Sequence, residues 1–436
     1  ATATAAAATS AAPLWRVLRI VPGGSSILHS ATRTPLMLVC ETVGAPSSEL
    51  GLYIRPSLGL GLTLRDRLRG KDLPASIKGK KAREAAAAQG RARGDGGSLL
   101  FAGGPAAGGQ GHANLSYGHM EHMSARGGMS SSDGMGMMEE DPSLAAFAAL
   151  EPSINRVFGE SQKMREQRVR QSSAFSRIPG WGLRSVIVKA GEDLRQEQLA
   201  NQMLVLAKEA FAEDGIPIRL HPYHIISTSN NAGLVEVVPD SVSIDQLKKR
   251  AGSDKNLRSI YQAAFGPAYS PTFNIAQQEF ARSLAGYSIL SYVLGVKDRH
   301  NANLLIDRFG RVIHIDFGFM LGNHPGAVMW ETAPFKMTRE YVDLLGGVGS
   351  PAFREFERLL VAGLFSLKKR ASAIVALLQL GLGAQYKGGV AVRQVAQRLS
   401  AIRTEQDVIQ LLAESLDARR TKQYDSYQWL TNGILP

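Results

Sequence analysis

The chain of 436 residues has a single cysteine, Cys40, so no internal disulfide can form, and a reducing compartment fits this composition. It also lacks the run of roughly 18 apolar residues that a membrane-spanning helix needs. The best candidate, residues 371–383, is shorter and contains Ser372 and Gln379. The opening stretch has neither the basic start nor the continuous apolar core of a signal peptide. We therefore expect a cytoplasmic protein.

Negative charge is in short supply, since the formal net charge is +12. Residues 65–93 hold ten Lys and Arg against three acids, a surplus of seven that leaves +5 for the rest of the chain. Such a basic run is usually a solvated tail, although it can add weak attraction to an anionic membrane. The charge therefore does not predict nucleic acid as a partner.

Composition divides the chain into four parts. Residues 14–44 contain two β-like runs, 17–21 and 36–43, and form a strand segment that we expect to pack with an N-terminal lobe. Residues 45–143 are rich in Gly, Ala and Met, and we expect them to be a disordered insert because they bury too little apolar area to offset ordering. Residues 144–240 and 241–436 are the expected N-lobe and C-lobe.

Strands are predicted first and helices second. We expect strands at 185–189, 218–227 and 234–238, with a helix at 193–212 between the first two. A hairpin at 303–306 and 312–315 is also expected. The predicted helices of the second half are 273–294, 350–380 (with breaks), 390–399 and 405–429. This order predicts an α+β, bilobal, protein-kinase-like fold with a β-rich N-lobe and a helical C-lobe, interrupted by the insert.

Lys189 ends the apolar run Val186-Ile187-Val188. An inward lysine at the end of such a strand holds the α- and β-phosphates of ATP in kinases, although alone it is more often a solvated strand edge. Eight residues later Glu197 lies on the predicted helix, where its carboxylate is placed to orient and neutralise the lysine.

Asp298 and Asn303 are five positions apart, the offset of the aspartate and asparagine in the protein-kinase catalytic loop. Phosphoryl transfer needs a carboxylate or imidazole to orient the attacking hydroxyl and an oxygen ligand for a metal ion. Asp298 and His300 are both candidates for the first role. Asn303 is a candidate for the second.

Asp316, Phe317 and Gly318 follow the predicted hairpin. The carboxylate of Asp316 offers a hard oxygen ligand for Mg²⁺, the aromatic ring packs behind it and the glycine gives the backbone freedom. Short Asp-Phe-Gly strings occur by chance, but the order of this string after Lys189 and the Asp298–Asn303 loop makes the chance explanation a poor one.

Together these motifs resemble the phosphatidylinositol 3-/4-kinase superfamily, whose loop reads Asp-Arg-His-x-x-Asn and is followed by His-Ile-Asp-Phe-Gly. Other stretches resemble the type III phosphatidylinositol 4-kinases of the beta class. They are residues 185–197, 297–303, 313–319, 331–336 and 421–433. The resemblance covers residues 150–436 and extends to the 16–43 segment.

The resemblance implies a role for each site residue. Lys189 contacts the ATP phosphates with Glu197 as its partner, and residues 234–238, including Glu236 and Val238, form the hinge that binds adenine. Asp298 or His300 activates the inositol hydroxyl, while Asn303 and Asp316 hold the metal. A loop at 172–181 covers the nucleotide, with Ser172, Ser173 or Ser176 over the phosphates. Residues 190–192 are expected to depart from the family without touching Lys189.

The implied cofactors are ATP and Mg²⁺ or Mn²⁺. The implied partner is phosphatidylinositol in membranes, and nucleic acid is not expected. The resemblance also implies peripheral association with the Golgi, the trans-Golgi or other endomembranes, and suggests small GTPases and calcium sensors as partners.

The segment from Phe317 and Gly318 to Lys336 carries one lysine, one histidine and no arginine. A substrate with ring phosphates needs several cations there, so the composition favours phosphatidylinositol itself. The choice of the 4-hydroxyl over the 3-hydroxyl as the site of phosphorylation comes only from the resemblance.

Near the C-terminus, Tyr424, Tyr427 and Trp429 predict either an amphipathic helix at a membrane interface or packing against the large lobe. Two alternative functions stay open: a phosphatidylinositol 3-kinase or related protein kinase, and an inactive kinase-fold membrane scaffold.

Overall fold

The computed structural model describes residues 15–24, 26–28, 35–44, 147–252, 254–325, 331–382 and 388–436. The chain divides into two units, residues 1–48 with 140–436, and residues 49–139. All described residues belong to the first unit. The predicted insert at 45–143 lies outside them.

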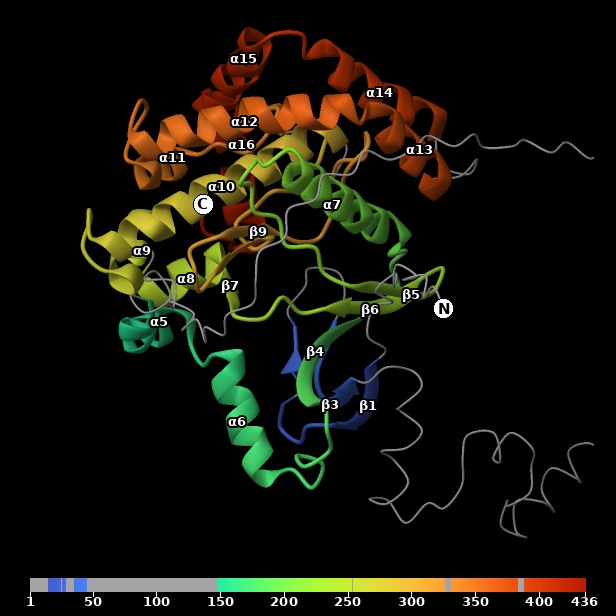
Figure 1. The fold of residues 1–436 in the computed structure, drawn as a ribbon, viewed down its shortest axis with the longest axis vertical. Coiled ribbons are helices and arrows are strands. Elements are labelled where there is room, and N and C mark those ends of the chain that lie inside the picture. Colours follow the sequence, from blue (N-terminus) through green and yellow to red (C-terminus); the bar gives the residue numbers. More distant parts are fainter. Residues whose placement is uncertain are drawn as a thin grey trace, which may run out of the picture. The chain divides into compact units, whose positions relative to one another are not determined.

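A six-stranded antiparallel sheet forms the first layer (Figure 1). The order is β1-β3-β4-β6-β5, with β2 paired to β3. The strands are β1 (Trp15–Ile20), β2 (Ser26–Ile27), β3 (Leu36–Gly44), β4 (Trp181–Ala190), β5 (Ile225–Ser229) and β6 (Ala232–Glu236).

Strand β3 pairs with β4 along its length, although the two are far apart in the sequence (Figure 1). Leu36 lies opposite Val188 and Val43 lies opposite Trp181. At the Trp181 end of the sheet, a small core of Val39, Val169, Trp181 and Leu183 joins the strands to the helix α6 (Gln162–Ser172). The N-terminal strands are therefore part of the lobe that carries Lys189.

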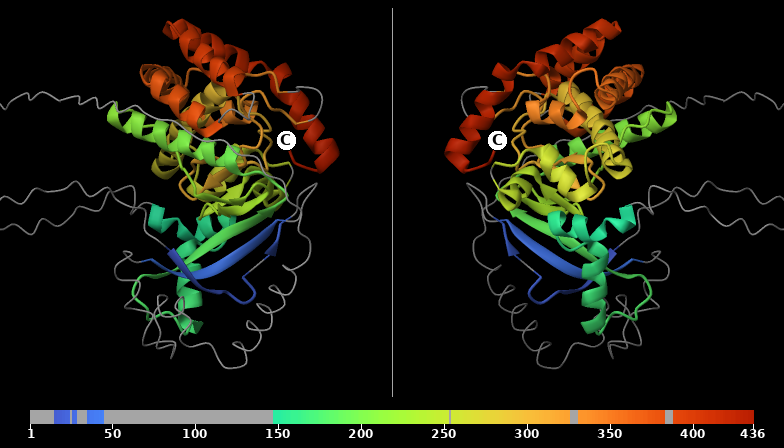
Figure 2. Two further views of the ribbon diagram at one scale, coloured as in Figure 1. Left: turned by 90° about the vertical axis from the view of Figure 1, so that its right-hand side faces the viewer. Right: turned by 90° about the vertical axis from the view of Figure 1, so that its left-hand side faces the viewer.

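A second, three-stranded sheet consists of β7 (Ser241–Ser243), β8 (Leu304–Asp307) and β9 (Val312–His314). Helices dominate the chain after β7, as Figure 2 shows from two sides. The other helices are α5 (Glu151–Phe158), α7 (Arg195–Glu213), α8 (Ile244–Ala251), α9 (Leu257–Phe265), α10 (Pro271–Leu294), α11 (Arg339–Leu345), α12 (Pro351–Lys369), α13 (Ala371–Leu382), α14 (Gly388–Ala401), α15 (Glu405–Leu416) and α16 (Ala418–Asn432). The predicted α+β bilobal fold is confirmed.

Helix α10 is the centre of the large lobe. It begins at Ser270, whose side chain accepts a hydrogen bond from the Phe273 N–H, and Pro271 fits the first turn because its missing N–H would have no helical partner there. Gly295 ends the helix in the left-handed conformation. Apolar residues are buried on every side of α10, so the lobe packs around it.

The predicted strand at 218–227 is wrong for most of its length, since only Ile225–Ser229 pairs. Pro222 cannot donate a ladder hydrogen bond, which keeps the preceding residues out of the sheet. The segment 350–380 has the break expected in it, at Arg370, whereas the single helix predicted at 405–429 divides in two at Asp417.

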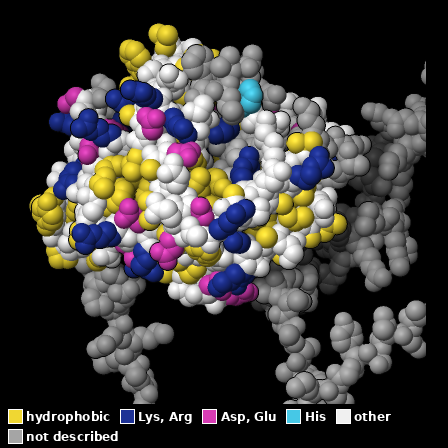
Figure 3. Space-filling model, turned by 90° about the horizontal axis from the view of Figure 1, so that it is seen from above, with side chains coloured by type: hydrophobic (Ala, Val, Ile, Leu, Met, Phe, Trp, Pro, Cys, Tyr) yellow, Lys and Arg dark blue, Asp and Glu magenta, His cyan; other side chains and the backbone are white. Residues whose placement is uncertain are grey.

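Seen from above, the surface carries acidic and basic side chains interspersed with hydrophobic patches (Figure 3). No single sign of charge covers this face. Among the described helices, none is both long and apolar enough to cross a bilayer.

Candidate active site

Lys189 lies near the end of β4, and α7 begins six residues later. Its Nζ is 3.3 Å from Oε2 of Glu197, the partner expected from the spacing. The Lys189 side chain is 11% exposed and that of Glu197 is 5% exposed, so the pair is shielded from water and its geometry is fixed by packing. Burial alone would lower the pKa of Lys189, but Glu197 and Asp316 outweigh it and raise the pKa, so the lysine stays charged.

Two more carboxylates reach the same ammonium group. Oδ2 of Asp316 lies 3.7 Å from Lys189 Nζ and Oε2 of Glu192 lies 3.4 Å from it. The expectation that residues 190–192 do not touch Lys189 is therefore wrong, because the turn after β4 folds Glu192 back over the strand end. One positive charge faces three acids, a balance that favours a further cation.

Tyr223 links Glu197 to Asp316, and no sequence motif points to this role. Its hydroxyl donates to Oε1 of Glu197 at 2.9 Å and accepts from the Asp316 N–H at 3.2 Å. Burial raises the pKa of Tyr223 well above its usual value, which keeps the phenol protonated. No spacing signal exposes this role, because the contacts span 26 and 93 residues.

The loop that follows α10 brings Asp298 and Asn303 together. Nδ2 of Asn303 donates to the Asp298 carbonyl at 3.0 Å and to its Oδ2 at 3.2 Å. Asp298 has a φ of 66°, an unusual conformation for a residue with a side chain. Glu331 holds it there by accepting from the N–H groups of Asp298 and Arg299.

Arg299 connects this loop to the Asp316 segment. The side chain is buried and donates to the carbonyl of Ile315 at 2.8 Å and to the carbonyl of Asp316. Its guanidinium also lies 5.4 Å from the centre of the Phe317 ring, which packs behind the aspartate as expected. The two motifs are therefore one rigid unit.

Asp298 and His300 are both placed as candidate bases. Burial raises the pKa of Asp298, and one of its oxygens accepts a hydrogen bond from the Tyr424 hydroxyl. His300 Nε2 lies 3.7 Å from Asp298 Oδ1. Burial, together with Arg299 and Lys336, lowers the pKa of His300 to about 4, so the imidazole is neutral at pH 7 and binds a proton weakly.

Asn303 and Asp316 suit a magnesium or manganese ion. They are linked through the backbone, where the Ile315 N–H donates to the Asn303 carbonyl at 3.1 Å. Because the Asn303 amide nitrogen points at Asp298, its side-chain oxygen remains a hard ligand. Among the described residues, no group of three or more acidic, histidine or cysteine side chains is arranged so that it could hold a metal ion. Two protein oxygens plus phosphate oxygens are the usual set for Mg²⁺ beside a nucleotide, so the residues fit.

Ser172 and Ser173 are not brought to Lys189. Ser173 lies before β4 and donates to Glu41, while Ser172 ends α6 and bonds to the Val169 carbonyl. Trp181 and Lys189 are eight positions apart in β4, which is about 26 Å in an extended strand. The expectation that these serines cover the phosphates is corrected: register places Leu36, and not residues 172–181, at the Lys189 end.

The predicted hinge lies between the lobes. Glu236 pairs with Val186, and its side chain binds Arg184 at 2.8 Å and His224 at 2.6 Å. The next residue, Val237, donates its N–H to the Ser185 carbonyl at 2.9 Å. Val238 is buried, and within the described part of the chain its N–H has no hydrogen-bond partner. An adenine ring needs such a donor.

The segment after Asp316 is anchored at both described ends. The Gln196 side chain donates to the carbonyls of Phe317 at 3.2 Å and Gly318 at 2.8 Å. Lys336 is only 7% exposed and its Nζ lies 2.7 Å from Asp425. Lys336 is therefore paired inside the protein. The apolar residues Val328, Met329 and Trp330 lie outside the described residues.

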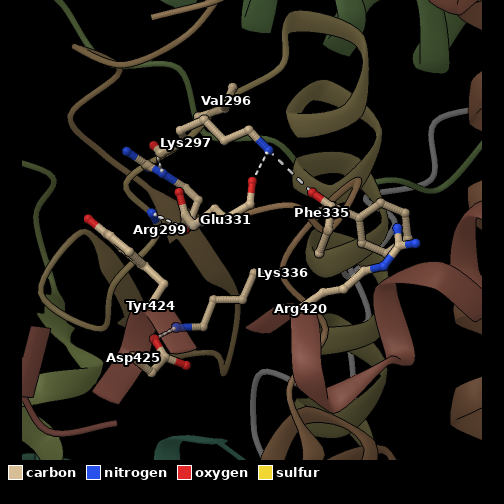
Figure 4. Close-up of a pocket in the computed structure, with 10 residues that line it drawn as sticks. Val296, Lys297, Arg299, Glu331, Phe335, Lys336, Arg420, Tyr424 and Asp425 are labelled. Atoms are coloured by element: carbon tan, nitrogen blue, oxygen red, sulfur yellow. Dashed lines mark hydrogen bonds and ion pairs between the residues drawn. The ribbon is translucent and has the colours of Figure 1, made fainter. Parts of the chain in front are cut away.

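Helix α16 packs directly on the 298–303 loop through the hydrogen bond from Tyr424 to Asp298. Figure 4 shows Lys336 directed at Asp425. Both residues line a small cavity of about 20 Å³, together with Lys297, Arg299 and Tyr424. That volume holds about one water molecule and no nucleotide. Tyr424 is 2% exposed, whereas Tyr427 and Trp429 are 44% and 56% exposed. The first aromatic residue thus packs on the lobe, and the other two face outward.

A strand lysine paired to a helix glutamate, an Asp-Asn loop and a hairpin leading to Asp-Phe-Gly, spread over two lobes, define a kinase fold. The comparisons identify the branch. Residues 184–386 match the family described as Phosphatidylinositol 3- and 4-kinase. These residues, just under half of the chain, are the part that is similar to this family.

Curated relatives agree with this assignment. Over 314 residues the chain is 40% identical to phosphatidylinositol 4-kinase beta 1 of Arabidopsis thaliana, covering 69% of this chain and 28% of the relative. It is 39% identical to a phosphatidylinositol 4-kinase of Dictyostelium discoideum over 287 residues, 64% of this chain and 24% of the relative. It is 37% identical to phosphatidylinositol 4-kinase beta of Rattus norvegicus over 305 residues, which are 68% of this chain and 36% of the relative. The match thus spans between a quarter and somewhat over a third of the length of these relatives.

Proposed function

We propose that the protein transfers the γ-phosphate of ATP to the 4-hydroxyl of phosphatidylinositol. The observation that carries the proposal is that carboxylate oxygens of Glu197 and Asp316 both lie within 3.7 Å of Lys189 Nζ, in a stretch that matches this family. The names of the relatives support the 4-hydroxyl.

Each residue then has one task in the reaction. Lys189, oriented by Glu197, contacts the α- and β-phosphates. The buried Val238 N–H donates a hydrogen bond to adenine. Asn303 and Asp316 hold Mg²⁺ or Mn²⁺, which neutralises charge developing on the phosphates. Arg299 keeps the carbonyl of Asp316 in place.

Asp298 is the better candidate to orient the attacking hydroxyl. Its carboxylate already accepts a hydrogen bond from one O–H group, that of Tyr424. An inositol hydroxyl needs the same acceptor. His300, with its pKa lowered to about 4, is a poorer proton acceptor and instead faces Asp298 as a neutral group.

The substrate is proposed to be phosphatidylinositol without ring phosphates. Each phosphate monoester would bring nearly two negative charges. The segment from Phe317 to Lys336 has only one lysine, and Asp425 already neutralises it. Plain phosphatidylinositol makes the smallest demand on this surface.

The test is to incubate the protein with labelled ATP and vesicles containing phosphatidylinositol or phosphatidylinositol 4,5-bisphosphate, and to identify the ring position labelled. We expect 4-phosphate from the first lipid and little product from the second. Label at the 3-position would establish the 3-kinase alternative. Binding of nucleotide without any transfer would favour the inactive scaffold.

Membrane contact is proposed for the exposed face of α16. Tyr427, Trp429 and Leu430 are 44%, 56% and 79% exposed, and aromatic rings of this kind favour the headgroup zone. Peripheral attachment to the Golgi or another endomembrane from the cytoplasm, and small GTPase or calcium-sensor partners, rest on the family resemblance alone.

The double variant Trp429→Ser, Leu430→Ser should lower vesicle binding and lipid phosphorylation while leaving ATP binding unchanged. Ile409→Ser on α15 is the matched control, since Ile409 is 46% exposed on a neighbouring helix. Equal vesicle binding by both variants would assign the membrane contact elsewhere.

A further inference from the structure

Tyr223 lies in the irregular segment before β5, outside every motif that the kinase function uses. It is 4% exposed. Its backbone N–H donates to Oδ1 of Asn201 at 3.0 Å, and Nδ2 of Asn201 donates to the Glu197 carbonyl at 3.2 Å. Asn201 on α7 thus fixes the Tyr223 backbone against the same helix that carries Glu197.

The Tyr223 hydroxyl gives the second carboxylate oxygen of Glu197 a hydrogen-bond donor. Lys189 occupies Oε2 at 3.3 Å, and the Tyr223 hydroxyl donates to Oε1 at 2.9 Å. The hydroxyl has one proton, so its remaining capacity is as an acceptor. The Asp316 N–H uses that capacity at 3.2 Å.

Asp316 needs such an anchor because its backbone is strained. Its φ is 58°, in the left-handed region that residues with a β-carbon rarely adopt. Such a conformation persists only where its surroundings hold it. Two side chains hold the backbone of Asp316. The Tyr223 hydroxyl accepts from its N–H, and the Arg299 guanidinium donates to its carbonyl.

We propose that Tyr223 is a positioning residue that couples the Lys189–Glu197 pair to the metal-binding aspartate. A single hydroxyl sets the orientation of Glu197 and the backbone of Asp316 together, so lysine and metal ligand are held in one geometry before nucleotide arrives. This inference rests on the proposed kinase function, since the metal and phosphates are those of that reaction.

The test is Tyr223→Phe, which removes one oxygen and keeps the ring. The Glu197 oxygen and the Asp316 N–H are then left without this partner in a buried site. We expect the Mn²⁺ concentration for half-maximal binding, measured by electron paramagnetic resonance with a non-hydrolysable ATP analogue, to rise about tenfold. The kcat should fall by a similar factor, with KM for phosphatidylinositol unchanged.

Tyr261→Phe is the matched control. Tyr261 is also fully buried, and its hydroxyl donates to a backbone carbonyl, that of Gly310, at 2.7 Å. Both variants should lower the melting temperature by a similar amount. Only the Tyr223 variant should shift the Mn²⁺ midpoint. Equal Mn²⁺ midpoints in the two variants would overturn the proposal and leave Tyr223 as a packing residue.

A second variant covers the case in which Tyr223→Phe does not fold. With 4-aminophenylalanine at position 223, the N–H donor to Glu197 remains but the acceptor for the Asp316 N–H is weak. This protein should fold and still need more Mn²⁺, and a wild-type midpoint would refute the coupling. Because Mn²⁺ and nucleotide binding needs no lipid, a wild-type protein that shows this binding but phosphorylates no phosphatidylinositol would defeat the proposed function alone.

Discussion

Glu41 in β3 and Glu197 on α7 are both buried, one near the Trp181 end of β4 and the other beside the Lys189 end, and they have different partners. Glu41 is 0% exposed and accepts hydrogen bonds from Arg19, Ser173 and Trp181. Burial alone would raise the pKa of Glu41, but these donors outweigh it and lower the pKa. Every charge in this cluster is met within the protein.

Glu197 is in the opposite position. Burial raises its pKa, and nearby Asp316 adds to the rise, while Lys189 opposes both. Lys189 itself is shared with Glu192 and Asp316. A buried acid with a full set of donors stabilises the fold, whereas acids that outnumber their lysine form a site that gains from a metal ion.

The largest expected effect is at Asp316. Asp316→Ala should lower turnover at least about a hundredfold, because it removes a metal ligand and one partner of Lys189. The melting temperature should stay close to that of wild type, since this side chain is 44% exposed and leaves no core cavity. Initial rates and thermal unfolding measure the two. Activity above a few per cent of wild type would end the assignment of Asp316 to the metal.

Glu197→Gln should separate activity from stability. The amide keeps the shape but loses the charge that orients Lys189, so kcat/KM for ATP should fall about tenfold. Unfolding should be unchanged or slightly harder, because a buried acid with a raised pKa is replaced by a neutral group. Denaturant titration alongside the kinetics would detect a loss of stability, which would place Glu197 in the same class as Glu41.

The candidate catalytic motifs could be found in the sequence because each of them is local. Asp298 and Asn303 lie five residues apart, and Asp316 follows the hairpin directly. Tyr223 and Glu331 were not given roles, since they reach these loops from 93 and 33 residues away.

The misplacement of Ser172 and Ser173 has the same origin. Which end of β4 lies beside which end of β3 depends on strand register across an insert of about a hundred residues, and no local pattern encodes it. The irregular stretch before β5 was likewise read as strand because its apolar residues fill the core without pairing.

Glu41→Gln should show the reverse of the Glu197 result. Rates measured at 25 °C should match wild type, because Glu41 lies at the Trp181 end of β4, distant from Lys189. Stability should fall by about 2 kcal/mol, since Arg19 loses its charge partner and at least one donor is left poorly matched. Arg358→Gln is a suitable control, because Arg358 pairs with Glu355 on the surface of α12. A rate change in the Glu41 variant would link this cluster to catalysis.

The smallest expected effect is the pH dependence of the difference in stability between wild type and Glu41→Gln. Its sign follows from the lowered pKa of Glu41. A carboxyl whose folded pKa lies below its unfolded value, near 4.5, binds fewer protons in the folded protein. Its contribution to stability is then complete above pH 4.5 and is lost as the pH falls through the folded pKa. Urea unfolding of wild type and Glu41→Gln at a series of pH values should show a constant gap between pH 6 and 8. The gap should narrow below about pH 4.5. A gap that widened on acidification would mean that the carboxyl is protonated in the folded protein, and the contrast with Glu197 would no longer hold.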